Sequence, residues 1–85
     1  MEKSLYTTQQ QKLQELLRQI RVEAGLRQVD LAGKLGEPQP FVSKYETGER
    51  LLDILEIRAI CGAVGITLEE FARRLENSVR EMLSG

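Results

Sequence analysis

The chain lacks histidine and tryptophan and has a single cysteine, Cys61, among its 85 residues. One cysteine cannot form a disulfide within the chain, and without histidine the sequence offers no metal-ligand set. A nucleophilic cysteine would need a partner base, and no histidine is present to serve as one. These absences predict a cytoplasmic protein that is not an enzyme and needs no metal or cofactor, with Cys61 as a small core residue.

Long apolar runs and an excess of one charge are also missing. No stretch approaches the ~20 apolar residues of a membrane-spanning helix, so no membrane partner is expected. The 12 basic and 13 acidic residues give a net charge of −1, and any basic surface for nucleic acid must therefore be local. A chain of this length is near the lower size for a single core, which favours one compact helical bundle.

Apolar residues recur at helical spacing in five segments of the chain. A first helix is expected over about residues 8–24, and Thr7 or Thr8 can cap it because a hydroxyl oxygen accepts a free amide. Two short helices are expected at about residues 28–35 and 39–47, with a tight break between them.

Two capping boxes mark the remaining helices. Asp53 stands three residues before Glu56 and opens a fourth helix that ends at Gly65, and Thr67 stands three residues before Glu70 and opens a fifth. The apolar stripe of this last helix continues to the end of the chain. The sequence therefore predicts an all-α fold, a compact five-helix bundle with an extended C-terminal helix.

The short helix at residues 39–47 has two different faces. Val42 and Tyr45 lie on one of them, and a helix this short must dock by its apolar face because it cannot be stable alone. The other face is left free to contact a partner. It carries four residues at helical spacing, namely Pro40, Ser43, Lys44 and Thr47.

A series of residues extends through this region: Gln28, Ala32, Gly36, the segment 39–46, and Glu46-Thr47-Gly48 followed by Arg50. In order and spacing these residues resemble the helix-turn-helix of phage repressors, the Cro/cI or XRE-like family. The resemblance extends from the first helix to Phe71 and implies the lambda-repressor-like fold. It also implies a sequence-specific DNA-binding transcriptional regulator whose partner is double-stranded DNA.

In this family the third helix lies in the major groove, so the resemblance implies that residues 39–47 do so here. The base-facing positions are those of Gln39, Pro40 and Lys44, with Ser43 less consistent. Gln39 can donate and accept in one plane, which fits adenine, whereas Lys44 only donates and fits guanine. Pro40 can offer only apolar contact, for example to a thymine methyl group.

The resemblance also implies contacts to the DNA backbone, which fix register without reading sequence. The family uses a glutamine at the position of Gln28 to hold a phosphate and to brace the recognition helix. Arg27, Thr47 and Arg50 are further phosphate candidates, and Lys34 is the weakest one. Arg27 can equally be a solvated surface cation.

Two further expectations concern structure. The family pairs an arginine late in the first helix with the glutamate that ends the third, and Arg21 and Glu46 occupy these positions. Two-fold dimers usually place two recognition helices ~34 Å apart on a pseudo-palindromic operator. We expect part of the interface to come from apolar residues of the last helix that have no evident cover in their own chain, Leu75, Val79, Met82 and Leu83.

These patterns divide the chain into a flexible arm at residues 1–7, a DNA-binding domain at 8–74 and a C-terminal dimerisation element at 75–85. Two alternatives stay open. The C-terminal element can instead fold back on the first helix. The domain can also be a helix-turn-helix module that binds a protein partner, such as an antitoxin component, which the near-neutral charge and Pro40 favour.

Overall fold

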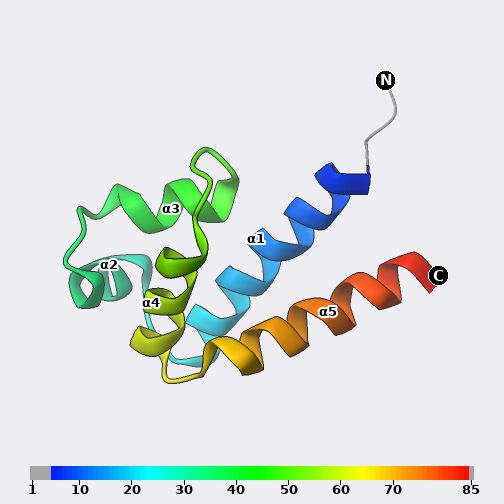
Figure 1. Cartoon of the computed structure of the whole chain (residues 1–85). Coiled ribbons are helices and arrows are strands. Elements are labelled where there is room, and N and C mark those ends of the chain that lie inside the picture. The colour runs from blue at the N-terminus through cyan, green and yellow to red at the C-terminus, as the bar shows by residue number, and fades with distance from the viewer. Residues whose placement is uncertain (1–4, 85) are drawn as a thin grey trace.

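A computed structural model of the chain describes residues 5–84, and these residues form five α-helices joined by short loops (Figure 1). The predicted all-α fold with five helices is confirmed. In chain order the helices are α1 (Leu5–Glu23), α2 (Gln28–Leu35), α3 (Pro40–Thr47), α4 (Ile54–Val64) and α5 (Leu68–Ser84). None of these helices is both long enough and apolar enough to cross a membrane.

The start of α1 differs from the sequence-based expectation. The helix begins at Leu5, so Thr7 and Thr8 lie inside its first turn and not at the residue before it. No glycine or proline interrupts this stretch, and adding a residue to an existing helix needs no new nucleus. Residues 5–7 of the expected arm are helical, and its residues 1–4 lie outside the described part of the chain.

The expected caps of the last two helices are present. The Glu56 amide donates to Asp53 Oδ1 over 2.7 Å, and the Asp53 amide donates to Glu56 Oε1 over 2.9 Å. The Glu70 amide donates to Thr67 Oγ1 over 3.0 Å. These bonds satisfy amides that have no partner within their own helix, which fixes where α4 and α5 begin.

A glycine with a positive φ separates α2 from α3. Gly36 has φ +68°, and its neighbour Glu37 donates its amide to the Ala32 carbonyl over 3.0 Å. This geometry closes the end of α2 and reverses the chain within a few residues. The tight break between the two short helices therefore comes from a backbone conformation that other residues rarely adopt.

All five helices contribute to one core. Cys61 is fully buried within it, as expected of a small core residue, and burial raises the pKa of its thiol. The thiol is therefore held in its unreactive protonated form. The core residues are Leu16, Leu17 and Ile20 of α1, Leu31 and Ala32 of α2, Val42 and Tyr45 of α3, Ile57, Ile60 and Cys61 of α4, and Phe71 of α5.

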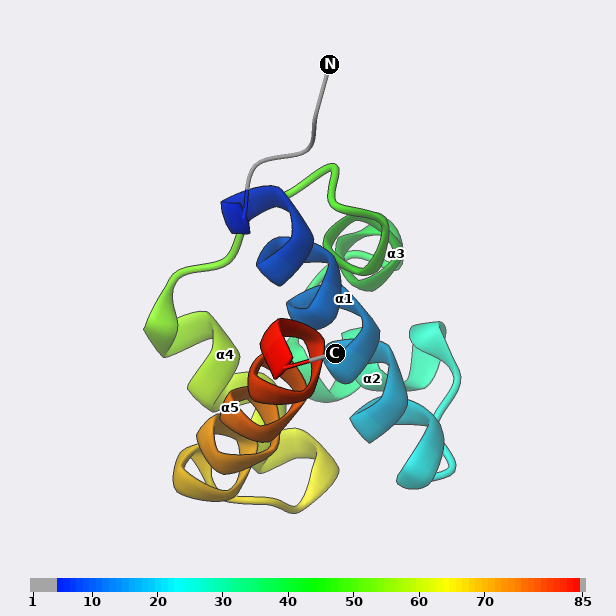
Figure 2. The same ribbon diagram turned by 90° about the vertical axis from the view of Figure 1, so that its right-hand side faces the viewer.

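The last helix lies beside the first, as the views in Figures 1 and 2 agree. Phe71 is buried and Leu75 packs against the core, so the stripe has an intramolecular surface at least to this point. Arg74 also forms a two-bond ion pair with Glu23 of α1, with N–O distances of 3.0 and 2.9 Å. The first half of α5 is thus fixed within its own chain.

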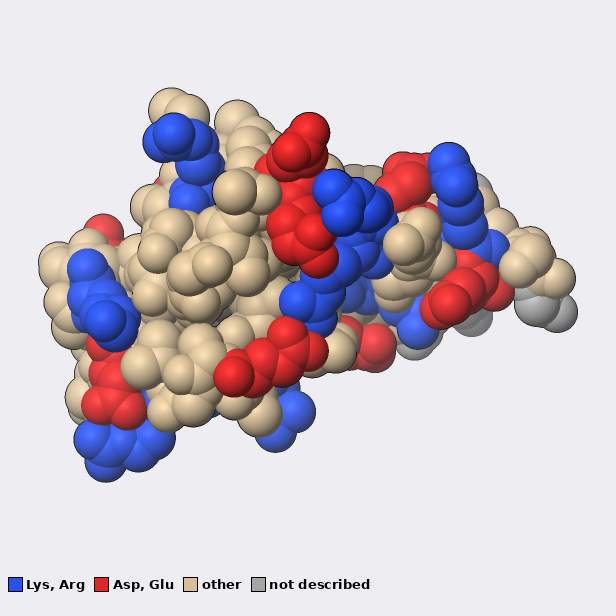
Figure 3. All heavy atoms as spheres, turned by 90° about the horizontal axis from the view of Figure 1, so that it is seen from below, with Lys and Arg blue, Asp and Glu red and all other residues tan. Residues whose placement is uncertain are grey.

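Charges of both signs are interspersed on the side of the molecule that faces away from α3. The view from below shows Lys and Arg beside Asp and Glu on the right, where the ends of α1 and α5 lie (Figure 3). The left half of that view has a tan area bordered by blue and red groups. This side therefore shows no continuous basic surface.

Candidate nucleic-acid interface

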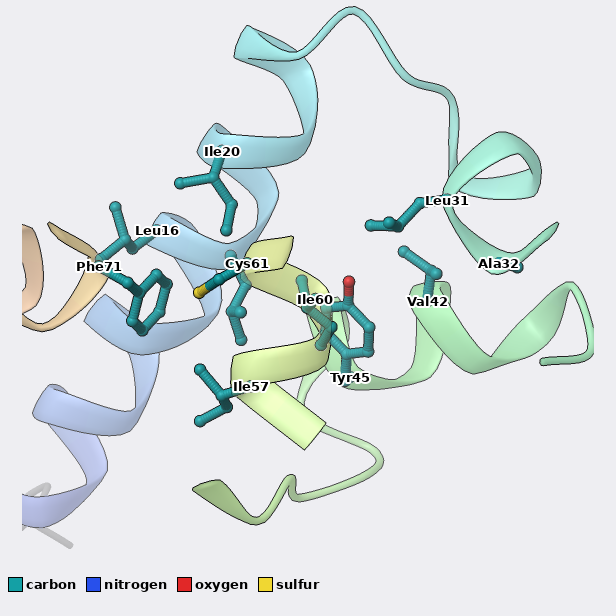
Figure 4. Packing of buried hydrophobic residues seen from close by; sticks show 11 residues of the cluster. Leu16, Ile20, Leu31, Ala32, Val42, Tyr45, Ile57, Ile60, Cys61 and Phe71 are labelled. Atoms are coloured by element: carbon teal, nitrogen blue, oxygen red, sulfur yellow. The ribbon is translucent and has the colours of Figure 1, made fainter. Parts of the chain in front are cut away.

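The third helix is held on the core by two side chains. Val42 and Tyr45 are 0% and 1% exposed, and Figure 4 shows Tyr45 pointing into the core beside Ile60. Leu31 of α2 is also fully buried, so α2 and α3 share one apolar contact region. Docking by this face leaves the other face of α3 directed away from the protein body.

Two side chains on this outer face have no hydrogen bond or ion pair within residues 5–84. The amide of Gln39 and the ammonium group of Lys44 are both exposed, and Pro40 beside them is exposed as well. Gln39 has a helical backbone conformation, with φ −51° and ψ −42°, and directly precedes Pro40. Both polar groups are therefore free to form bonds with a partner.

The hydroxyl groups on the same face are already bonded to their own helix. Ser43 donates to the Pro40 carbonyl over 3.1 Å, and Thr47 donates to the Ser43 carbonyl over 3.0 Å. Ser43 is half-buried and Thr47 is exposed. Each hydroxyl oxygen still has acceptor capacity, so both residues can receive a hydrogen bond without losing these contacts.

A buried polar network connects α3 to α1 and α2. Arg21 donates from Nε to Glu46 Oε2 over 2.7 Å and from Nη2 to Oε1 over 3.1 Å. The two side chains are only 10% and 4% exposed, and the hydrogen bond to Glu46 raises the pKa of Arg21. The structure thus brings together the two residues of the expected ion pair, and it neutralises an acid at the end of α3.

Gln28 belongs to the same network. Its Nε2 donates to Glu46 Oε1 over 3.0 Å, while Arg21 Nη1 donates to the Leu26 carbonyl over 2.8 Å. Gln28 is half-buried at the start of α2, so its side chain is positioned to brace α3. Its Oε1 accepts no hydrogen bond from the described residues, and a phosphate offers no donor to it. A contact from Gln28 to phosphate would therefore have to use Nε2 or the backbone amide.

Arg27 is exposed but not free. Its guanidinium group donates to both carboxylate oxygens of Asp30, with distances of 3.0 and 2.9 Å, and its amide donates to Asp30 Oδ2 over 2.9 Å. The guanidinium hydrogen bond, followed by the amide one, lowers the Asp30 pKa to about 2. Arg27 is the N-cap residue of α2, and its side chain has no oxygen. The Asp30 carboxylate therefore accepts the hydrogen bond from the Arg27 amide.

Arg50 is held in a similar way. Its Nη2 donates to Glu56 Oε2 over 2.8 Å, and its guanidinium lies 4.7 Å from the centre of the Phe41 ring. The hydrogen bond from Arg50 lowers the Glu56 pKa. The arginine is therefore fixed beside α3 by one ionic and one cation–π contact.

These two acidic partners, Asp30 and Glu56, were not predicted from the sequence. Asp30 lies three residues after Arg27 on one helical turn, a spacing that could have revealed it. Glu56 was recognised only as a capping residue, and its contact with Arg50 spans the loop before α4. No local sequence pattern predicts the contact between Arg50 and Glu56. Lys34, the weakest phosphate candidate, is exposed on α2.

Comparison with known proteins places this geometry in a family. The helix-turn-helix family model matches residues 17–71, which include α2, α3 and α4 in full. The chain belongs to the Cro/cI-type (XRE) helix-turn-helix family. Members of this family are DNA-binding regulators of transcription and not enzymes, so the chain carries a DNA-binding domain.

Solved structures of this family are similar over nearly the whole chain. An XRE-family like protein from Pseudomonas syringae pv. tomato str. DC3000 is 39% identical with a TM-score of 0.79, over 85% of this chain and 88% of that one. The restriction-modification controller protein C.Esp1396I is 25% identical with a TM-score of 0.79, over 94% and 99%. A tyrosine-to-phenylalanine mutant of that controller is 29% identical with a TM-score of 0.75, over 98% and 96%. Comparison with curated proteins gives no match.

Proposed function

We propose that this helix-turn-helix protein regulates transcription by inserting α3 into the major groove of a specific DNA sequence. The observation that carries the proposal is the docking of α3. Val42 and Tyr45 hold it by one face, and the polar groups of Gln39 and Lys44 on the other face are exposed and unbonded within the described chain. A major groove about 12 Å wide admits a helix in this position.

The four base-contacting candidates would have different roles. Gln39 both donates a hydrogen bond to adenine and accepts one from it, and Lys44 donates to guanine O6 or N7. Pro40 contacts a thymine methyl group, and Ser43 adds an acceptor because its proton is used within the helix. Discrimination therefore comes mainly from Gln39 and Lys44, at ~1–3 kcal/mol for each good contact.

The backbone contacts would surround α3. Gln28 and the free amides at the start of α2 hold one phosphate, and Thr47 contacts another. Arg27 and Arg50 join them only when each exchanges its carboxylate partner for a phosphate. Because both ion pairs are substantially exposed, this exchange requires little free energy.

Two-fold pairing is part of the proposal, since one short helix makes too few contacts to select a single operator. The end of α5 was expected to supply the interface. Val79 and Met82 there are half-buried and Leu83 is 57% exposed, which leaves apolar surface for a second copy. Leu75 is already packed against the core and contributes less.

Selection of bound duplexes from a random DNA pool tests the function directly. The expected result is one enriched pseudo-palindrome whose binding weakens steeply with salt. If no duplex is enriched, the proposal is rejected, and the protein-binding alternative, with a partner such as a toxin, takes its place.

Separate substitutions of Lys44 and Lys34 form a matched test of the roles of these two residues. On the selected duplex, Lys44→Ala should cost ~1–3 kcal/mol and relax the preference at one base pair. Lys34→Ala removes the same charge from the surface of α2 and should weaken binding slightly and equally for all sequences. Equal effects of the two substitutions on sequence preference would contradict base contact by Lys44.

A further inference from the structure

A glutamine of α1 lies directly against the end of α3. The amide of Gln14 packs on Gly48, the residue that caps α3 with φ +87°. In both ribbon views the chain that follows α3 passes beside the first half of α1 (Figures 1 and 2). A side-chain carbon added at Gly48 would come within 2.6 Å of Gln14 Nε2 and 3.2 Å of its Cδ. Glycine is therefore required here both for its positive φ and because the Gln14 amide occupies the space of a side chain.

The amide of Gln14 is not used within the described chain. Gln14 is half-buried, and its side chain forms no hydrogen bond with any of residues 5–84. Gln19 and Gln28, by contrast, each donate to a carboxylate, over 2.8 and 3.0 Å. Gln14 thus holds two N–H donors at the end of α3 that are available to a partner.

We propose that Gln14 donates a hydrogen bond to a phosphate of the DNA backbone at the edge of the major groove. This contact rests on the proposed insertion of α3 into DNA and adds a contribution from α1. Gln14 lies outside residues 17–71, the part of the chain that the helix-turn-helix family model matches. The contact is therefore not one that the family pattern assigns.

The length of α3 places its end near the phosphates. Its eight residues span about 12 Å, which is close to the width of the major groove. When Gln39 at the start of α3 faces the base edges, the end at Thr47 comes to the edge of the groove. The Gln14 amide lies within about 8 Å of the Thr47 Cα, since only Gly48 separates them. Gln14 and Thr47 are thus positioned to hold the same phosphate or neighbouring ones.

The surroundings of Gln14 are compatible with a phosphate. The C-terminus of a helix repels anions through its free carbonyl groups. At this end of α3 the Gly48 amide donates to the Tyr45 carbonyl over 3.4 Å, and the Arg50 amide donates to the Lys44 carbonyl over 3.1 Å. Glu49, the acidic residue of this turn, is exposed and can turn towards water. The guanidinium of Arg50 adds a positive charge on the same connection.

Fluorescence anisotropy with the selected duplex, at several salt concentrations, tests the contact. Gln14→Met keeps the length of the side chain but removes its donors, and it should weaken binding at least about fivefold because the lost bond is to a charged group. Gln14→Lys replaces a neutral donor by a cation and should steepen the fall of log K with log salt by about 0.9 per bound chain. Both effects should be equal for all duplexes, because a phosphate contact does not read sequence.

Gln19 provides the matched control on the same helix. It lies about 7.5 Å farther along α1 and about 140° around it, and its amide bonds Glu23. Gln19→Met and Gln19→Lys make the same chemical changes and should alter the affinity by less than about twofold. Urea unfolding checks that Gln14→Met keeps the stability of the wild type.

Three results would overturn the contact. The first is a Gln14→Met variant that binds as tightly as the wild type. The second is a Gln14→Lys variant whose salt dependence equals that of Gln19→Lys. The third is a loss of binding by Gln14→Met that is matched by a loss of stability, since this would assign Gln14 to the packing of α3 alone.

The contact and the function fail separately. A wild type that enriches a duplex, while all the Gln14 and Gln19 variants bind that duplex equally, rejects the contact and leaves the regulator standing. A wild type that enriches no duplex rejects both.

Discussion

Replacing Arg21 by alanine should destabilise the domain far more than removing any surface arginine. The substitution leaves Glu46 with a side chain only 4% exposed and without the cation that neutralises it. Gln28 would be the remaining side chain within residues 5–84 that donates a hydrogen bond to it. Removing one partner of a buried pair typically costs ~3–5 kcal/mol, because the other charge stays buried and uncompensated.

This cost is large for a chain of 85 residues. At ~0.05–0.15 kcal/mol per residue, its total stability is on the order of 4–13 kcal/mol. A loss of ~3 kcal/mol corresponds to a melting temperature lower by roughly 12–24 °C in a domain of this size. Arg21→Ala should therefore lose a large share of the stability, and it is expected to be partly unfolded if the wild type is near the lower limit.

Urea unfolding followed by circular dichroism measures the difference. The control is Arg73→Ala, because the Arg73–Glu70 pair is 62% and 41% exposed and contributes no more than ~1 kcal/mol. A double variant, Arg21→Met with Glu46→Met, should recover most of the lost stability because no unpaired charge is left. If Arg21→Ala unfolds at the same urea concentration as Arg73→Ala, the argument for a buried, neutralised Glu46 is refuted.

Three further outcomes are expected. Glu56→Gln frees Arg50 for phosphate and should tighten DNA binding by up to ~5-fold. Glu76→Gln, which removes the charge from the Arg80–Glu76 pair on α5, should not change binding. Equal binding by both variants would contradict competition between Glu56 and phosphate for Arg50. Because the Asp30 pKa is lowered to about 2, its stabilising effect is complete above its ordinary pKa and is lost as the pH falls towards 2, so Asp30→Asn should flatten an acid titration of stability in that range. Tyr45→Phe removes a buried hydroxyl that has no hydrogen-bond partner among the described residues, so it should leave the melting temperature unchanged or raise it, and a clear fall would show that the hydroxyl has a partner.

The helical architecture was largely predictable because its signals are local. Apolar periodicity, the capping boxes at Asp53 and Thr67, and the break at Gly36 each act within a few residues of the chain. The start of α1 was predicted less well. A threonine can cap a helix or lie within one, and no breaker precedes Thr7 to decide between them.

The candidate site was predictable where a family pattern covers it. The opposite faces of α3 follow from a period of 3.6 residues, and the core side of that helix is as expected. The state of Arg50 was not predictable, because it meets Glu56 across a loop and stacks on Phe41. Such contacts depend on how the α3–α4 connection folds, which no periodicity describes.

What the sequence alone determined is which segments are helical and which face of each is apolar, since both properties depend on residues only three or four positions apart. Only the tertiary structure decided which charges are used within the chain and which apolar residues stay uncovered. Arg50 and Glu56 meet across the loop before α4, and the side chains of Leu51, Ile54 and Leu55 are exposed because no residue in the described range 5–84 covers them. Burial is a property of the assembled helices, and so it cannot be read from any one of them.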